Sequence, residues 1–267
     1  MSVLTAEHGV CSEDVGASRM LAMRSGEIGS VHSWDMVTDT DGPGTRLSIR
    51  LAGCPLRCQY CYGPDAWLMR DGVLHTVDTV MARILRDASL IRAGGGGVTL
   101  SGGEPLLQPA FVAQVLRACR EEGLHTALDT SGYLGRRLTD AMVGDLDLVL
   151  LDLKSGLPDT YREVTGRDLA PTLELGRRLA ERGTAMWARF VVVPGLTDQW
   201  QNVEAAADYL ATLGSLERVD VVPFDQRGRA TWHTLGREYR LEMTEPPDEE
   251  LLDRVRGQFR TRALHVT

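Results

Sequence analysis

Short runs of apolar residues alternate along the chain with segments in which apolar residues recur every three or four positions. The short runs predict strands and the recurring pattern predicts helices. The predicted strands span residues 45–52, 97–100, 125–129, 147–153, 186–193 and 218–223. The predicted helices lie between and after them, at 76–92, 109–122, 136–144, 171–182, 199–213 and 247–260. The pattern therefore predicts six consecutive units of one strand followed by one helix.

Two of these strands contain runs that are apolar at every position, at residues 148–151 and 190–193. Such runs are typical of parallel strands covered on both faces. Six units are fewer than the eight of a closed barrel, so we predict an α/β fold, a partial (βα)6 barrel with parallel strands and an open lateral mouth. A doubly wound sheet is the alternative. Residues 1–28 show no sustained period and predict a flexible N-terminal extension, and residues 29–267 predict one core domain.

Net charge and the lengths of the apolar runs limit the kinds of partner that we expect for this protein. The 267 residues carry a net charge of −8, so we expect no broad cationic surface for nucleic acid. No run of eighteen apolar residues predicts a membrane helix, and nothing at the N-terminus resembles a secretory signal. We therefore expect a cytoplasmic protein without nucleic-acid or membrane partners.

Three cysteines follow the first predicted strand at the spacing C-x3-C-x2-C, namely Cys54, Cys58 and Cys61. Thiolates hold the iron atoms of iron–sulfur clusters, normally one per iron, so three cysteines leave one iron of a [4Fe-4S] cluster open to another ligand. Structural zinc would require four ligands, and neither a fourth cysteine nor a histidine stands close by. The spacing favours an open cluster over zinc or unligated cysteines.

This cysteine motif, followed by Gly-Gly-Glu after the second strand, resembles the radical S-adenosylmethionine superfamily. The runs at 40–46, 128–132, 151–154 and 191–195 are similar to the glycyl-radical-enzyme activases, above all to those that act on pyruvate formate-lyase. The resemblance extends from about residue 28 to the end. It implies that S-adenosylmethionine chelates the open iron of a [4Fe-4S] cluster and is reductively cleaved there. The resulting 5′-deoxyadenosyl radical would then abstract hydrogen from a glycine Cα.

The resemblance also implies roles for single residues. The three cysteines would be the catalytic residues that hold the cluster. The residues that contact S-adenosylmethionine would be Cys61, Tyr60, Tyr62, Gly102, Gly103, Glu104, Asp152, Leu153, Lys154, Arg189 and Asp225. Tyr60 could instead pack at the surface, and Asp152, Lys154 and Arg189 could form a structural ion-pair network. Lys154 is the only lysine against 28 arginines, which favours a site that needs a compact ammonium group.

Two further sites follow from the same resemblance. Asp129, Thr130 and Asp152 match a monovalent-cation site, for which oxygen ligands are suited; capping or core hydrogen bonding is the alternative. Asp41 lies in a stretch that is close to the substrate peptide in the activases. The chain departs from the family at Tyr62, where activases commonly have histidine, and at Asp225, which replaces another histidine.

The implied partners are a glycyl-radical enzyme, with pyruvate formate-lyase favoured, and an electron donor such as flavodoxin or ferredoxin. Activation of another glycyl-radical enzyme, such as a dehydratase or decarboxylase, is an alternative. Many such activases carry a cysteine-rich insertion, and the chain has none between Cys61 and Gly102. Direct action on a small molecule is a third hypothesis. A non-catalytic electron carrier would normally close the fourth cluster position with a cysteine.

Overall fold

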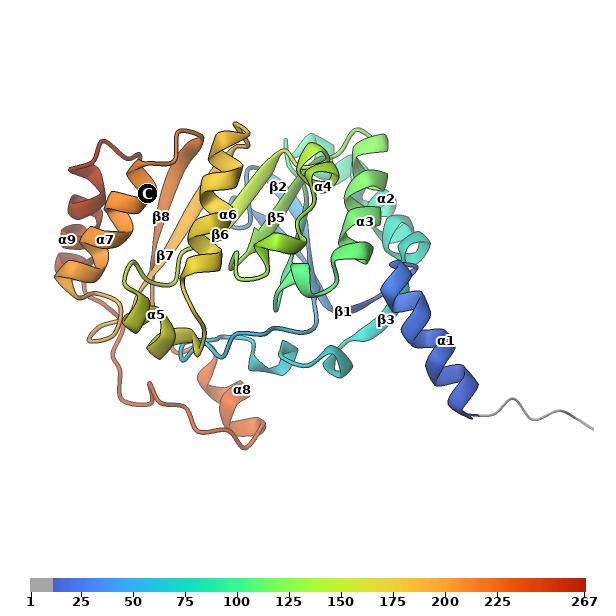
Figure 1. The fold of residues 1–267 in the computed structure, drawn as a ribbon, viewed down its shortest axis with the longest axis horizontal. Helices are drawn as coiled ribbons and strands as arrows, with labels where there is room; N and C mark the ends of the chain where they lie inside the picture. Colours follow the sequence, from blue (N-terminus) through green and yellow to red (C-terminus); the bar gives the residue numbers. More distant parts are fainter. Residues whose placement is uncertain (1–11) are drawn as a thin grey trace, which may run out of the picture.

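The structure is a computed structural model that describes residues 12–267, and its centre is one twisted sheet of eight strands (Figure 1). The strand order is β3-β1-β2-β4-β5-β6-β7-β8. Neighbouring strands from β2 to β8 run parallel. They are β2 (Thr45–Leu51), β4 (Gly97–Gly102), β5 (His125–Thr130), β6 (Leu148–Asp152), β7 (Met186–Val192) and β8 (Leu216–Pro223). All six predicted strands are confirmed. Their order never reverses, whereas a doubly wound sheet has a reversal at its switch point, so the partial-barrel prediction is confirmed.

Helices follow the parallel strands and cover one side of the sheet (Figure 1). They are α2 (Val77–Ala93), α3 (Pro109–Glu121), α4 (Asp140–Gly144), α6 (Ala170–Glu181), α7 (Trp200–Ala211) and α9 (Glu249–Arg260). These match the six predicted helices, except that a separate turn at Gly135–Arg137 precedes the shorter α4. Over residues 12–267, no helix combines the length and apolar character that a membrane span needs.

Several elements were not predicted. Strands β1 (Ile28–Thr38) and β3 (Val73–Thr76) extend the sheet in antiparallel pairing. Short helices α5 (Pro158–Thr165) and α8 (Arg229–Thr234) lie in the loops after β6 and β8.

The N-terminal region also differs from the prediction. Helix α1 (Ser12–Ser25) occupies part of the expected flexible extension, and residues 1–11 lie outside the described residues. Met20 and Leu21 are both exposed in this helix, so its apolar residues do not form the buried stripe that makes a helix recognisable. The division of the chain at residue 28 stays a prediction.

The two faces of the sheet differ in character. Side chains alternate between the faces along each strand. The side chains on one face, including Ile49, Leu100 and Phe190, pack against the helices and form the apolar core. On the concave face, a small apolar cluster that includes Leu148 and Leu150 adjoins polar residues from neighbouring strands, namely Ser48, Ser101, Asp129, Asp152 and Arg189. The runs predicted to be apolar therefore fill the core, and the polar positions gather on one inner surface.

Arg46 fastens the loop before β2 to the sheet. Its side chain is fully buried and donates to the Thr99 hydroxyl at 2.8 Å and to the carbonyls of Pro43 and Val98 at 3.1 and 2.9 Å. Burial lowers the pKa of its guanidinium group to about 10, which leaves it charged at neutral pH. The turn that contains Asp41 is thereby held against β4, where Thr99 also donates to the Asp41 carbonyl at 2.7 Å.

We expect Arg46→Met to lower the free energy of unfolding by about 3 kcal/mol, because it leaves buried carbonyls without their charged donor. Chemical unfolding followed by circular dichroism measures the change. Arg120→Met, at an exposed position in the last turn of α3, is the matched control and should change stability by less than about 0.5 kcal/mol. Equal stabilities of the two variants would contradict the anchoring role of Arg46.

Candidate active site

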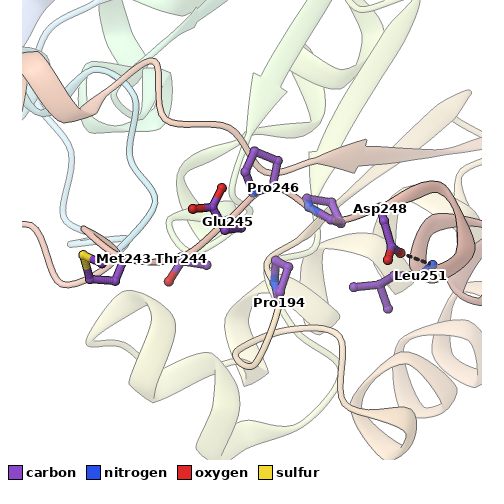
Figure 2. Close-up of a pocket in the computed structure, with 8 residues that line it drawn as sticks. Pro194, Met243, Thr244, Glu245, Pro246, Asp248 and Leu251 are labelled. Carbon is purple, nitrogen blue, oxygen red and sulfur yellow. Dashed lines mark hydrogen bonds between the residues drawn. The ribbon is translucent and has the colours of Figure 1, made fainter.

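A surface hollow of about 490 Å³ lies beside the end of β7 (Figure 2). Its lining consists of Pro194, Met243, Thr244, Glu245, Pro246, Pro247, Asp248 and Leu251. Asp248 is occupied as the N-cap of α9, where it accepts from the Leu251 N–H at 2.8 Å. Pro194, from the run at 191–195, lines this hollow, but none of the predicted site residues does, because those gather around the cysteine loop and the concave face of the sheet.

The cysteine loop leaves β2 at Gly53, which has a φ of +96°. The Gly53 N–H donates to the Ala66 carbonyl at 2.7 Å, and the Cys54 N–H donates to the Trp67 carbonyl at 3.0 Å. A Cβ atom at Gly53 would lie 2.5 Å from Met69 and Leu107 side-chain atoms. Glycine is therefore required at the point where the loop turns back on itself.

The two unpredicted helices after β6 and β8 hold this loop in place, and both lie at the same end of the sheet as the loop (Figure 1). The N–H groups of Arg57 and Gln59 donate to carbonyls at the end of α5, at 2.9 and 3.0 Å. In α8, the Trp232 indole donates to the Cys61 carbonyl at 2.7 Å. The loop is thus tied to segments more than a hundred residues away in sequence.

The three loop cysteines are unpaired and partly buried. Burial raises the pKa of all three thiols, to about 12 for Cys58, so without a bound metal they are neutral. Nearby groups favour the thiolates: Lys154 lowers the pKa of Cys58, and the Gly63 N–H and the Trp67 indole lower that of Cys61. Iron binds the thiolate form of cysteine. Lys154, the Gly63 N–H and the Trp67 indole would stabilise that form, so the surroundings of the cysteines suit iron ligands.

Among residues 18–267, no group of three or more His, Cys, Asp or Glu side chains is arranged to hold a single metal ion. A [4Fe-4S] cluster binds each thiolate at a different iron atom, and three cysteines on one loop suit such a cluster. The assignment of the three cysteines as its ligands stays a prediction.

Tyr60, between two of the cysteines, has a buried hydroxyl with no hydrogen-bond partner in the described part of the chain. The Lys154 ammonium lies 5.7 Å from the centre of its ring. A buried hydroxyl left without a partner costs about 1–3 kcal/mol. A bound cofactor with polar groups would remove this cost, so the surroundings of Tyr60 fit the predicted S-adenosylmethionine.

Gly102 and Gly103, at the end of β4, allow the backbone there to lie close to the end of β2 and to the cysteine loop. Gly102 has a φ of +112°, and a Cβ atom there would lie 2.3 Å from the Leu51 nitrogen. A Cβ atom at Gly103 would lie 2.4 Å from the Gly53 carbonyl oxygen. The glycines are therefore required by contacts within the protein, and their predicted contact with the cofactor stays a prediction.

We expect Gly103→Ala to destabilise the protein by about 2 kcal/mol and to reduce the iron bound after reconstitution, because the added methyl group meets backbone atoms of the cysteine loop. Thermal unfolding and iron analysis measure the two effects. Gly257→Ala is the matched control: this position lies inside α9, and an added Cβ would have nothing within 4 Å. It should raise stability slightly. A Gly103→Ala protein with normal iron content and stability would contradict this account.

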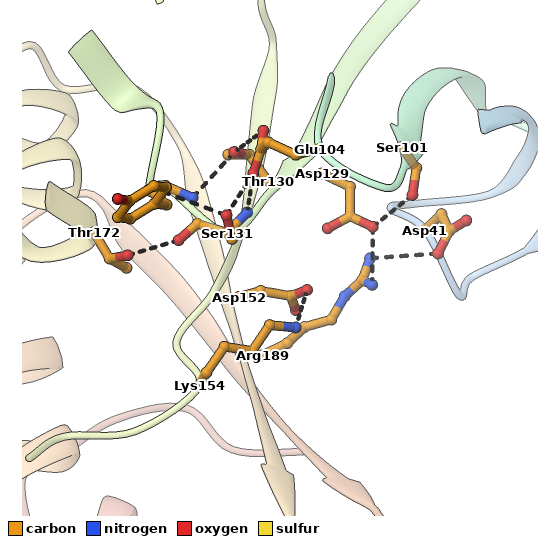
Figure 3. Close-up of polar contacts among 12 residues, drawn as sticks. Asp41, Ser101, Glu104, Asp129, Thr130, Ser131, Asp152, Lys154, Thr172 and Arg189 are labelled. Carbon is orange, nitrogen blue, oxygen red and sulfur yellow. Dashed lines mark hydrogen bonds and ion pairs between the residues drawn. The ribbon is translucent and has the colours of Figure 1, made fainter. Parts of the chain in front are cut away.

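Glu104 is fully buried and accepts four hydrogen bonds (Figure 3). One oxygen accepts from the Leu106 N–H at 3.1 Å and the Thr130 hydroxyl at 2.7 Å, and the other accepts from the Ser131 N–H and hydroxyl. Burial raises the pKa of Glu104, while these donors oppose the increase. Its carboxylate holds the turn after β5, and the predicted contact with the ammonium group of the cofactor stays a prediction.

Arg189 joins two carboxylates on the concave face (Figure 3). Its guanidinium group lies 3.4 Å from an Asp41 oxygen and 3.3 Å from an Asp129 oxygen. Ser48 and Ser101 donate to Asp41 and Asp129 at 2.7 and 2.8 Å. Burial raises the pKa of Asp129 to about 6. Asp41, predicted near a substrate peptide, thus belongs to the same polar network as the strand-end residues.

Lys154 and Asp152 form a second pair on the same face, with 2.7 Å between Nζ and the carboxylate (Figure 3). Burial opposes ionisation of Asp152, but Lys154 and Arg189 lower its pKa below the usual value. The side chain of Leu153 is buried in the core, and its N–H donates to the Arg189 carbonyl at 3.0 Å. The structure therefore brings Asp129, Asp152, Lys154 and Arg189 together.

Three predicted residues have other surroundings. The Thr130 hydroxyl is buried and donates to Glu104 at 2.7 Å. Asp225 is paired with Arg227, at 2.6 Å between Oδ2 and Nε. Tyr62 is 57% exposed, with Arg50 4.5 Å above its ring. The cofactor and cation roles of these residues stay predictions.

The sequence interpretation missed the residues that support the loop. Trp67 and Trp232 are nearly buried, with ring centres 5.0 Å apart, and Trp232 bonds the loop directly. A Cβ atom at Gly228 would lie 2.6 Å from the Tyr62 Cα atom, so glycine is needed where the loop after β8 crosses the cysteine loop. A tryptophan six residues after the last motif cysteine is the signal that could have identified Trp67.

Comparison with known proteins assigns the family. Residues 48–208 match the Radical SAM superfamily. The chain is 36% identical over 232 residues to the pyruvate formate-lyase 1-activating enzyme of Escherichia coli K12, covering 86% of this chain and 94% of that protein. It is also 36% identical over 223 residues to the pyruvate formate-lyase-activating enzyme of Clostridium pasteurianum, covering 84% of this chain and 93% of that enzyme.

Comparison with solved structures supports the same family and fold. A domain of the pyruvate-formate lyase-activating enzyme from Bacteroides vulgatus superposes with a TM-score of 0.55 at 26% identity, covering 65% of this chain and 98% of that one. A radical SAM methyltransferase from Sphaerobacter thermophilus has a TM-score of 0.63 at 16% identity over 90% of this chain and 76% of that one, which shows the shared fold. The chain belongs to the radical SAM superfamily and, within it, to the family of pyruvate formate-lyase-activating enzymes.

Proposed function

We propose that this protein is an oxidoreductase that installs a glycyl radical in a partner enzyme, with pyruvate formate-lyase as the favoured partner. The cofactors of its family are a [4Fe-4S] cluster and S-adenosylmethionine. When bound at the cluster, S-adenosylmethionine would supply the radical chemistry: one electron from a donor protein would cleave it into methionine and a 5′-deoxyadenosyl radical. Hydrogen transfer from a glycine Cα to this radical would yield 5′-deoxyadenosine and the glycyl radical.

The observation that carries this proposal is the three-cysteine loop at the mouth of the sheet, beside a buried tyrosine hydroxyl without a partner. Cys54, Cys58 and Cys61 would hold three irons, and the fourth is left for the cofactor. Tyr60 would bind a polar group of S-adenosylmethionine.

Other residues of the concave face would bind and orient the cofactor. Lys154 would bind its carboxylate as a compact cation, while Asp152 keeps that lysine in position at 2.7 Å. Asp225 would bind the ribose hydroxyls by exchanging its contact with the exposed Arg227. Asp129, Thr130 and Asp152, with a main-chain carbonyl near Leu150, would bind a monovalent cation.

The site must also receive a polypeptide. We place the substrate glycine near Asp41, which is fixed by Ser48 and Arg189 on the concave face. The electron donor would be a flavodoxin or ferredoxin, and the cytoplasm is the compartment in which the donor and the partner enzyme would meet it.

The test is electron paramagnetic resonance after the reduced protein is mixed with S-adenosylmethionine and pyruvate formate-lyase. We expect the doublet of a glycyl radical and one equivalent of 5′-deoxyadenosine for each radical. A second glycyl-radical enzyme, such as a dehydratase, serves as the comparison. A doublet in the dehydratase alone would overturn the choice of partner, and absence of 5′-deoxyadenosine in every mixture would overturn the proposed chemistry.

A further inference from the structure

Three exposed arginines surround the cysteine loop, Arg57, Arg167 and Arg237, and we call them the loop arginines. Arg57 donates to the carbonyls of Cys54 and Leu56, each at 2.7 Å. Arg167 donates to the Pro55 carbonyl at 2.8 Å. Their positive charges are therefore fixed to the backbone of the loop that carries the cysteines.

Trp67 connects two of the loop arginines to the cysteines. The guanidinium carbon of Arg57 lies 4.7 Å from the centre of its ring, and that of Arg237 lies 4.9 Å from the same centre. The two cations are thus held on one aromatic ring despite their mutual repulsion. Cys61 packs against the apolar cluster to which Trp67 belongs, and the Trp67 indole lowers the pKa of the Cys61 thiol. One side chain therefore contacts both the charged surface and a cluster ligand.

The loop arginines lack acidic partners in the described part of the chain, although the protein carries a net charge of −8. In the described residues, no carboxylate lies within 4.0 Å of their guanidinium groups. Two carboxylates close to them in sequence are engaged elsewhere, since Asp168 pairs with Arg162 at 2.7 Å and Glu242 pairs with His233 at 2.9 Å. The loop arginines are thus left without ion-pair partners from the described residues.

We propose that the loop arginines form the docking surface for an anionic one-electron donor protein, and that Trp67 connects this surface to Cys61. This inference rests on the proposed function, in which each cleavage of S-adenosylmethionine consumes one electron. In the docked complex the donor loses one electron and the cluster gains it, without transfer of a proton or formation of a bond.

The exposure of the cations separates this surface from the cofactor site. The side chains of Lys154 and Arg189 are only 14% and 16% exposed and are paired with carboxylates on the concave face. The loop arginines are exposed and unpaired, which suits contact with a protein rather than a small cofactor. Complementary charge mainly increases the rate of association, and salt weakens this effect.

The test uses the reconstituted full-length protein and reduced flavodoxin as the probe. Arg237→Glu reverses a charge that contacts the loop only through Trp67, and Arg120→Glu makes the same change in the last turn of α3. Stopped-flow absorbance measures cluster reduction over a range of NaCl concentrations. At low salt we expect reduction of the Arg237→Glu protein to be about tenfold slower, with a weaker salt dependence. The Arg120→Glu protein should match the unmodified protein.

Dithionite separates this inference from the proposed function. With dithionite as reductant, the Arg237→Glu protein should form 5′-deoxyadenosine at the normal rate, because a small reductant needs no docking surface. Equal flavodoxin rates for the two variants would overturn the docking surface. It would also be overturned if Arg237→Glu slowed only radical transfer to pyruvate formate-lyase, since the surface would then bind that enzyme. If the unmodified protein formed no 5′-deoxyadenosine with dithionite, the proposed function itself would fail.

Discussion

Replacement of Cys58 by alanine is expected to abolish both the iron–sulfur cluster and the formation of 5′-deoxyadenosine. Cys58 is the central cysteine of the loop, and Lys154 is placed to favour its thiolate. Two remaining thiolates would leave two irons without protein ligands. We expect activity to fall by more than about 100-fold, the upper end of the loss caused by removing an outer-shell partner of a metal ligand. Iron and sulfide analysis after anaerobic reconstitution, and chromatography of the products with dithionite, measure the two losses.

Cys119→Ala is the matched control for this prediction. Cys119 is fully buried in α3, with its sulfur 3.9 Å from that of Met81, and lies outside the cysteine loop. It behaves as a small apolar side chain, so its replacement should cost about 1 kcal/mol of stability and leave the cluster intact. Retention of full iron content in Cys58→Ala would show that the three-cysteine assignment is wrong.

The parallel strands were predictable because each is a short apolar run that the core requires. In β6, for example, residues 148–151 are all apolar, and both faces of the strand are buried. The antiparallel β1 gave a weaker signal, because its buried residues occupy only its first half and the rest is partly exposed. Helix α5 is only eight residues long, so it contains too few turns for a period to be recognised.

The candidate site was predictable in its location and less so in its contacts. Parallel strands end at one edge, so residues such as Asp129 and Asp152 had to meet there. Which atoms remain free for a ligand depends on neighbours that no local pattern indicates. Glu104 is occupied by donors 26 and 27 residues away, and Trp232 reaches the Cys61 carbonyl over 171 residues. Such contacts follow from the path of the loops, which the apolar pattern does not encode.

Replacement of Lys154 by methionine is expected to weaken binding of S-adenosylmethionine by about 100-fold, which corresponds to about 2.7 kcal/mol, while the cluster is retained. The change removes the ammonium group that lies 2.7 Å from Asp152 and leaves that largely buried carboxylate without its partner. An anionic carboxylate of the cofactor would then meet uncompensated negative charge. Anaerobic calorimetry on the reconstituted protein measures the affinity, and iron analysis confirms that the cluster is present.

Lys154→Arg is the control that keeps the charge but changes its shape. A planar guanidinium group replaces a compact ammonium, so we expect it to keep the pair with Asp152 and to recover only part of the affinity. Because Lys154 is the only lysine, reductive methylation modifies this side chain and the α-amino group alone, and mass spectrometry distinguishes them. Bound S-adenosylmethionine should protect Lys154 from methylation. Normal affinity in Lys154→Met, together with unprotected methylation, would limit Lys154 to pairing with Asp152 and remove it from the cofactor site.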